Sequence, residues 1–356
     1  MLATNKLDDK TLNIALHKIN TTFKELPTPN YLDGFQKWFQ GRLADWQGTF
    51  LRIGLVGITS AGKSTFINAL AGEDILPRAA QPTSGILVIC RKASQRKLTI
   101  FFQDGDNQEF EGEECDKEWV SRYADEKENP NNEQKVKEIQ LSLPTLMIPE
   151  KYDMIDSPGL DAFGLEGHEE LTLRTLIPLV DVVLFLTTTK SSSDKENLKA
   201  LSNICKEAKP AIVIQTHKDA VEPRYMAGGK IVETTEQVLD KHRQRVRQLL
   251  EQTPTLQTAP ILQVSSVQAL NARMQSPGGF QDSPDWEESG FEEITEVLSE
   301  LYDKVSQKVA VRRIKLLYKE LQKLIDKVRS DYNMAKGNFE EAQRYKNLEL
   351  KALQDL

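Results

Sequence analysis

Several features that would assign this chain of 356 residues to a specialised class are missing or rare. Its three cysteines, Cys90, Cys115 and Cys205, form no C-x-x-C pair, which argues against a disulfide framework or a zinc site. No segment reaches the roughly 18 to 20 apolar residues that a membrane span needs. The longest apolar run, LIPLVDVVLFL, is interrupted by Pro178 and Asp181, so we predict a buried strand there.

An excess of positive charge is also absent. The 46 lysines and arginines against 53 aspartates and glutamates give a formal net charge of −7, which argues against a broad basic face for nucleic acid. The short basic runs at 241–247 and 312–315 are interpreted as solvated helix faces. The first ten residues lack the apolar core of a secretory signal. We therefore expect a cytoplasmic protein with no nucleic-acid partner.

The middle of the chain alternates between apolar segments and amphipathic ones. This order predicts an α/β fold with a mostly parallel central sheet flanked by helices. Two polar segments, 103–135 and 271–290, are predicted to be mobile surface loops. The predicted strands lie within 51–57, 85–92, 97–104, 138–144, 152–159, 182–189, 211–217 and 260–266, and the predicted helices near 64–71, 167–178, 194–208 and 232–252.

Helices are predicted at both ends of the chain. Apolar residues recur at helical spacing over 10–26, and a second helix is predicted at about 31–46. From Phe291 onward the pattern is helical again. A seam of apolar residues with steps of three and four needs a partner helix, for which the N-terminal helices are the expected choice. The seam residues are Ile314, Leu317, Leu321, Leu324 and Val328.

The segment GITSAGKS, Gly57 to Ser64, fits the pattern G-x-x-x-x-G-K-[ST] and lies between a predicted strand and a predicted helix. In that context the backbone N–H groups converge on phosphate, Lys63 reaches the β- and γ-phosphates, and the Ser64 hydroxyl binds Mg²⁺. A chance glycine turn is the alternative, and the flanking elements disfavour it. The predicted phosphate-binding residues are Thr59, Ser60, Ala61, Gly62, Lys63, Ser64 and Thr65.

Further metal and γ-phosphate contacts are predicted on two later segments. Asp156 ends a buried strand in the pattern D-x-x-G, where it would hold a metal-bound water while the Gly159 N–H meets the γ-phosphate. Thr83, with Ser84 as the second choice, would bind Mg²⁺ through its hydroxyl, on a loop that the γ-phosphate orders. The alternatives are that Asp156 only caps a turn and that Thr83 only follows Pro82 in a turn.

The segment THKD at 216–219 follows an apolar strand, and GTPases read guanine with N/T-K-x-D at this place. The Asp219 carboxylate can accept hydrogen bonds from guanine N1–H and the exocyclic amine, whereas adenine offers no such pair. His217 stands where the pattern has lysine, so a flat imidazole would cover the base, and Lys218 is either a contact or a surface lysine. A later segment, ILQVSS, supplies two further contacts. The predicted base-binding residues are Thr216, His217, Lys218, Asp219, Ser265 and Ser266.

With these motifs in order, residues 50–270 resemble the dynamin superfamily of GTPases, especially its bacterial dynamin-like branch. The resemblance implies N-terminal helices of a helical neck at 1–48, a GTPase domain at 49–290 and C-terminal helices of a neck or stalk at 291–356. It also implies that dimerisation of GTPase domains activates the enzyme. Higher assembly and membrane remodelling are further functions that the resemblance leaves open. Lipid would then bind through a segment beyond residue 356, since no end signal precedes Leu356, and the protein would be peripheral at a membrane.

The resemblance also implies a mechanism. Leu160 follows D-x-x-G and cannot orient water as glutamine does in Ras-like enzymes. In dynamin-like enzymes a phosphate-loop serine, here Ser60, helps to hold a monovalent cation (K⁺ or Na⁺) and the attacking water, although Thr59 replaces the usual preceding residue. The expected catalytic residues are Ser60, Lys63, Thr83 and Gly159. The reaction would convert GTP to GDP.

Three other functions are weighed against this one. A slow GTP-gated switch would recruit a protein partner through its helical neck, and a turnover that does not rise with protein concentration would favour it. A ribosome-assembly GTPase is disfavoured by the acidic charge balance and the missing basic appendage. A P-loop ATPase is disfavoured because Asp219 would have no task.

Overall fold

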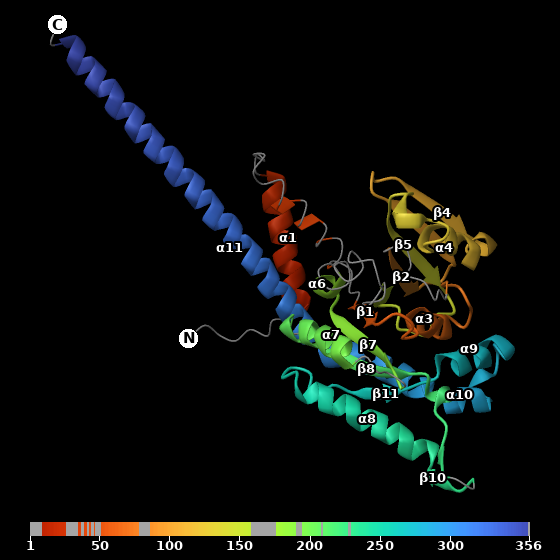
Figure 1. Cartoon of the computed structure of the whole chain (residues 1–356). Helices are drawn as coiled ribbons and strands as arrows, with labels where there is room; N and C mark the ends of the chain where they lie inside the picture. Colours follow the sequence, from red (N-terminus) through yellow and green to blue (C-terminus); the bar gives the residue numbers. More distant parts are fainter. Residues whose placement is uncertain are drawn as a thin grey trace. The chain divides into compact units, whose positions relative to one another are not determined.

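The computed structural model describes residues 9–25, 35–36, 39–40, 43, 46, 51–77, 86–157, 176–189, 194–207, 209–226 and 229–354. The chain divides into two compact units, Phe50–Lys304 and a second unit made of Met1–Thr49 with Val305–Leu356. Figure 1 labels the elements of both units along the chain, and each unit is described by itself.

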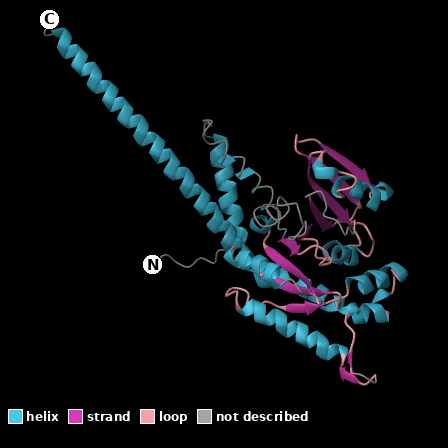
Figure 2. Ribbon diagram, viewed as in Figure 1, coloured by secondary structure: helices cyan, strands magenta, loops and turns pink. Residues whose placement is uncertain are grey.

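The larger unit is built on a nine-stranded sheet in the order β11-β8-β7-β1-β6-β2-β5-β3-β4, drawn in magenta in Figure 2. The five strands β11, β8, β7, β1 and β6 are parallel to one another, so their carboxyl ends share one edge. β2 is antiparallel to β6 but parallel to β5, and β3 is antiparallel to both β5 and β4. The strand bounds are β1 Leu51–Gly57, β2 Leu87–Lys92, β3 Lys97–Phe102, β4 Asn107–Glu111, β5 Val136–Leu143, β6 Tyr152–Asp156, β7 Val182–Thr188, β8 Ala211–Thr216 and β11 Ile261–Gln263.

The central strands are apolar because helices cover them. All residues of β1, β6 and β8 are buried, as expected for parallel strands covered on both faces. α7 packs against β7, α8 packs against β11, and α3 packs against α9. These helices are α3 Lys63–Ala71, α7 Asp194–Lys206, α8 Thr235–Glu251 and α9 Ser266–Gln275, and the short helix α6, Ile177–Leu179, precedes β7. The predicted fold class, a mostly parallel sheet flanked by helices, is confirmed.

The prediction of a mobile loop at 103–135 is wrong. The segment contains β4, a 3₁₀ turn at Gly112–Glu114, helix α4 at Lys117–Ala124 and a 3₁₀ turn at Pro130–Asn132. α4 buries only Val120, Tyr123 and Ala124, and most of its other residues are polar, so the sequence shows no clear helical pattern of apolar residues.

The prediction of a mobile loop at 271–290 is also wrong. α9 continues to Gln275, and a 3₁₀ turn at Phe280–Asp282 leads into α10, Pro284–Ser289. The ring centroids of Phe280 and Trp286 are 4.7 Å apart, and both side chains are buried. Proline and glycine suggested a loop, but proline at the first position of a helix is compatible with helical structure.

The second unit is helical in its described part. It contains α1, Asp9–Glu25, and most of α11, which runs over Phe291–Gln354. An apolar cluster joins Leu12, Leu16, Phe39, Leu43, Trp46 and Leu317, which confirms the N-terminal helices as partners of the apolar seam. Val328, further along the seam, is 38% exposed. None of the helices in the described ranges is long and apolar enough to cross a membrane.

Candidate nucleotide-binding site

The phosphate loop connects β1 to α3, and its two glycines have different tasks. A Cβ on Gly57 would lie 2.3 Å from the carbonyl oxygen of Leu186, so this position accepts no side chain. Gly62 caps α3 with φ of 82°, in the left-handed region that glycine adopts without strain. Ser60 also has positive φ, 61°, and its side chain is exposed at the tip of the loop. Thr59 and Ala61 lie in the same loop, and Thr65 lies in the first turn of α3.

Lys63 is the first residue of α3 and is buried, with 8% exposure. Its Nζ donates to the carbonyl oxygens of Gly57 at 3.1 Å and Ile58 at 3.0 Å. These bonds hold the ammonium within the phosphate loop. The buried ammonium also interacts electrostatically with the Asp156 carboxyl, so it adds positive charge to this end of the sheet.

Ser64 and Asp156 come together at the carboxyl edge of the sheet. Ser64 Oγ donates to Asp156 Oδ2 at 2.7 Å, although the two residues lie 92 positions apart. Burial raises the pKa of the Asp156 carboxyl, while Lys63, Ser64 and the Ser157 amide lower it. A desolvated carboxylate beside a hydroxyl fits Mg²⁺, which takes oxygen ligands from one or two carboxylates together with substrate phosphates.

Ser157 has a positioning role that the sequence analysis missed. Its N–H donates to Asp156 Oδ1 at 3.0 Å, and its Oγ donates to the carbonyl of Leu55 at 2.6 Å. The first bond orients the Asp156 carboxylate, and the second ties β6 to β1. The serine in the segment DSPG was the available signal.

The predicted base-binding segment, residues 216–219 and called the base loop below, is joined directly to the phosphate loop. Thr216 ends β8, and its Oγ1 donates to the carbonyl of Ala61 at 2.9 Å. His217 lies next to the phosphate loop, since a Cβ on Gly62 would be 3.8 Å from His217 Cε1. Sequence analysis predicted both segments as parts of one site, and the structure brings them together.

The Thr216 hydroxyl also contacts His217. Thr216 Oγ1 and His217 Nδ1 are 2.9 Å apart, and the same hydroxyl lies 2.9 Å from the Ala61 carbonyl and 3.3 Å from the Thr187 carbonyl. Which of Oγ1 and Nδ1 donates depends on the tautomer of the imidazole. Thr189, which sequence analysis missed, donates from Oγ1 to the His217 carbonyl at 3.0 Å and supports its left-handed backbone.

Lys218 and Asp219 lie in a 3₁₀ turn, Lys218–Ala220. The Lys218 N–H donates to the Val264 carbonyl at 3.1 Å, and its Nζ donates to the Glu288 carbonyl at 2.8 Å. The Asp219 side chain is exposed.

Ser265 and Ser266 begin α9, beside the base loop. Ser265 Oγ accepts from the Gln268 N–H at 3.2 Å, and the Ser265 N–H donates to the Ser289 carbonyl at 2.8 Å. The Ser265 amide is thus engaged within the chain. Ser266 follows as the first residue of the helix and is 6% exposed.

The remaining predicted residues, Thr83, Ser84, Gly159 and Leu160, lie outside the described residues. Across the ranges that are described, no three or more histidine, cysteine, aspartate or glutamate side chains group into a metal site. A metal at Ser64 and Asp156 therefore needs ligands from elsewhere, and nucleotide phosphates can supply them.

The strand, glycine-bearing loop and helix, with a buried lysine and a Ser–Asp pair, define an α/β nucleotide-binding domain of the P-loop class. Residues 53–218 match the family model described as the dynamin family. A bacterial dynamin-like protein of Nostoc punctiforme is 25% identical over 330 residues, which are 84% of this chain and 46% of that protein. Dynamin-like protein A of Bacillus subtilis is 28% identical over 160 residues, 45% of this chain and 12% of that protein.

The family-model match and the relatives thus make this chain similar to the dynamin superfamily, and among its members to bacterial dynamin-like proteins. A solved structure of an oligomerised bacterial dynamin pair, described as providing a mechanism for long-range sensing and tethering of membranes, superposes with a TM-score of 0.51. It is 17% identical and covers 97% of this chain and 51% of its own, so it supports the fold alone. The chain spans about half the length, or less, of the curated relatives it matches.

Proposed function

We propose that this chain binds GTP with Mg²⁺ and hydrolyses its γ-phosphate. The observation that carries the proposal is the Ser64–Asp156 hydrogen bond of 2.7 Å beside the buried Lys63. Three groups from two elements thereby supply the cation, the hydroxyl and the carboxylate that a metal-bound triphosphate needs.

Each residue has a separate task in this proposal. Lys63 balances charge on the β- and γ-phosphates, and the carboxylate of Asp219 selects guanine. Ser64, Asp156 and Thr83 would hold Mg²⁺, which when bound supplies neutralising charge to the phosphates. The backbone N–H groups from Thr59 to Thr65 would bind phosphate oxygens at the start of α3.

The attacking water needs an orienting group. We assign this task to Ser60, at the exposed tip of the phosphate loop, together with the backbone of Thr83, the Gly159 N–H and a K⁺ or Na⁺ ion. The water oxygen bonds to the γ-phosphorus, the bond to the bridging oxygen breaks, and the products are GDP and inorganic phosphate.

The similarity to the dynamin family supports a wider role. We propose that two GTPase domains pair during turnover, that further assembly follows, and that the protein is peripheral at a membrane. The membrane proposal rests on the family and on the description of the solved bacterial dynamin pair as a membrane tether.

The test is the GTPase rate measured against protein concentration, in K⁺ and in Na⁺, with ATP as the control nucleotide. We expect a rate per protein molecule that rises with concentration, depends on the cation and is much lower with ATP. A low rate per molecule at all concentrations favours the alternative, a GTP-gated switch, and ATP turnover equal to GTP turnover would contradict the base assignment.

Ser60→Ala is expected to lower turnover by about a hundredfold, because one group that positions water in the transition state is lost, with little change in GTP affinity. Ser60→Gly is the matched variant. It also lacks the hydroxyl but relieves the positive φ of 61°. Single-turnover kinetics should show slow hydrolysis in both variants, and normal turnover in either removes Ser60 from the mechanism.

A further inference from the structure

We propose that Gln215 and Gln263 are positioning residues that set the preference for guanine. Through helix α8 they would hold the two predicted base-binding loops, residues 216–219 and 264–266. Gln215 directly precedes Thr216 at the end of β8, and Gln263 ends β11 just before Val264 and Ser265. The inference rests on the proposed function, because it assigns these loops to the base.

The two side chains are buried amides, with 2% and 7% exposure, and they form one hydrogen-bonded network. Gln263 Nε2 donates to Gln215 Oε1 at 2.9 Å and to the Leu239 carbonyl at 2.7 Å. Gln215 Nε2 donates to the His242 carbonyl at 3.1 Å. Leu239 and His242 belong to α8, so both strands are tied to the same helix.

Arg243 completes the network from the surface. Its Nη2 donates to Gln263 Oε1 at 3.0 Å, and this charge-assisted bond fixes which end of the amide faces the sheet. Flipping either amide would place two donors or two acceptors against each other. The network therefore has one arrangement, and it determines where α8 lies along β8 and β11.

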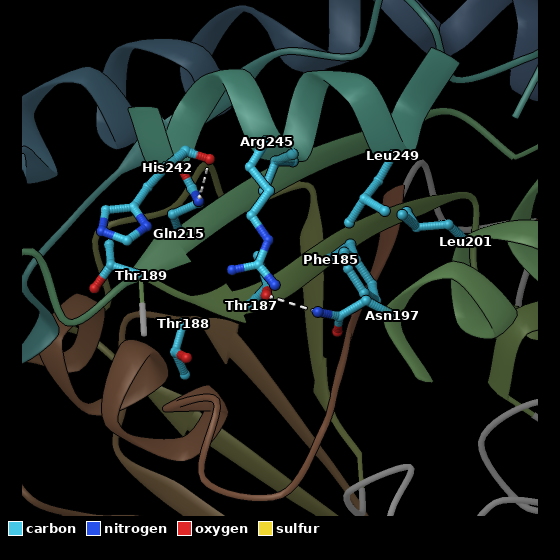
Figure 3. A pocket seen from close by; sticks show the side chains of 11 residues that line it. Phe185, Thr187, Thr188, Thr189, Asn197, Leu201, Gln215, His242, Arg245 and Leu249 are labelled. Atoms are coloured by element: carbon cyan, nitrogen blue, oxygen red, sulfur yellow. Dashed lines mark hydrogen bonds between the residues drawn. The ribbon is translucent and has the colours of Figure 1, made fainter. Parts of the chain in front are cut away.

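The apolar face of α8 is narrow. The helix buries Val238, Leu239, Val246 and Leu250, and its exposed residues are polar or charged. A small cavity of about 20 Å³ lies between α8 and the elements β7, β8 and α7, near Gln215, Arg245 and Asn197. Figure 3 shows Gln215 bonded to the His242 backbone at one side of this cavity. Where packing leaves such a gap, directional polar bonds set the register.

The two loops are also bonded to each other. The Val264 N–H donates to the Gln215 carbonyl at 2.9 Å, and the Lys218 N–H donates to the Val264 carbonyl at 3.1 Å. A shift of α8 would move Gln215 and Gln263 together, and with them the loops that carry Asp219 and Ser265, relative to the phosphate loop. The phosphate loop has its own bonds and would be affected much less.

The experiment measures dissociation constants for GDP, IDP and ADP by titration calorimetry, with melting temperatures alongside. Gln263→Glu keeps an acceptor for Arg243 but loses both donated bonds. Arg243→Gln tests the same network at an exposed position, where a substitution is expected to leave the fold intact. Asn129→Asp is the matched control, because the buried Asn129 amide likewise donates to a backbone carbonyl and to another amide oxygen. Asn129 precedes β5, on the other side of β1 in the sheet order.

Gln263→Glu should weaken GDP binding roughly 2- to 30-fold. ADP affinity should not change, because ADP relies on the phosphate loop, so the ratio of GDP affinity to ADP affinity should fall. Arg243→Gln should give a smaller shift in the same direction. Asn129→Asp should lower the melting temperature and leave the ratio intact. An unchanged ratio in Gln263→Glu, or equal weakening of GDP and ADP, overturns the inference while the proposed function stands. Wild-type protein without a preference for GDP overturns both.

Discussion

The phosphate loop and the base loop reach the same site by different means. The phosphate loop is built by local sequence: its glycines, its positive φ angles and a lysine that bonds to carbonyls five and six residues away. The base loop is built by distant contacts, from Thr216 to Ala61 and from Lys218 to Val264. A loop whose contacts lie within one short segment can thus be recognised as a motif in the sequence. A loop that is held by hydrogen bonds to distant segments can have other residues and still occupy the same position in the fold.

The largest expected effect is a loss of nucleotide affinity after a substitution in the phosphate loop. Lys63→Ala should weaken binding of GTP and of ATP by at least about a hundredfold, because it removes a buried charge opposite the phosphates. Titration calorimetry measures this. Lys209→Ala is the control, since Lys209 is also a buried lysine that donates to a carbonyl, that of Val180, at the start of β8. It should lose stability and still bind nucleotide.

The next largest effect is a change in base preference after a substitution in the base loop. Asp219→Asn should weaken GTP binding at least about a hundredfold, because an amide cannot accept both hydrogen bonds from guanine. Its NH₂ group can donate to the 2-oxo group of xanthine, so XTP affinity should rise. Competition binding with GTP, XTP and ATP measures both changes. Equal losses for all three nucleotides would show that Asp219 supports the fold and does not read the base.

Thr216→Val tests the bond between the two loops. The valine keeps the side-chain shape, but it leaves the Ala61 carbonyl and His217 Nδ1 without their partner. We expect GTP affinity to fall about tenfold, the typical cost of one buried unsatisfied group. Thr189→Val loses a hydroxyl bond to His217 without touching the phosphate loop and should have a smaller effect. Equal effects of the two substitutions would contradict the bridging role of Thr216.

The smallest expected effect concerns stability. Burial raises the Asp156 pKa, so the folded state favours the protonated carboxyl, and ionisation lowers the free energy of unfolding as the pH rises above the usual aspartate range. Asp156→Asn should therefore stabilise the nucleotide-free protein by about 1 kcal/mol at neutral pH, with no gain at acid pH. Calorimetry across the pH range measures this. The same substitution should abolish Mg²⁺-dependent hydrolysis, and a gain that grows toward acid pH would contradict the pKa shift.

Some elements of the fold could be predicted from the sequence and others could not. The buried strands and the apolar seam at Leu317 were predictable because their patterns repeat along the chain. Helix α4 was not, because only three of its side chains are buried. The turn around Phe280 and Trp286 was missed because two aromatic rings, not the local turn residues, determine it.

The same division holds at the site. Lys63, Ser64 and Asp156 were predictable from motif and strand order, and the structure brings them together. Thr189, Ser157 and the Gln215–Gln263 pair were not, because their contacts join elements far apart in sequence. Thr83 and Gly159 stay predictions.

The central claim is that the phosphate loop binds a triphosphate while Asp219 selects guanine. Equilibrium binding of non-hydrolysable GTP and ATP analogues to the wild-type chain, with Mg²⁺, tests it most directly. The account predicts tight uptake of the guanine analogue, far weaker uptake of the adenine analogue, and loss of both in Lys63→Ala. No uptake of the guanine analogue, or tighter binding of the adenine analogue, would contradict it.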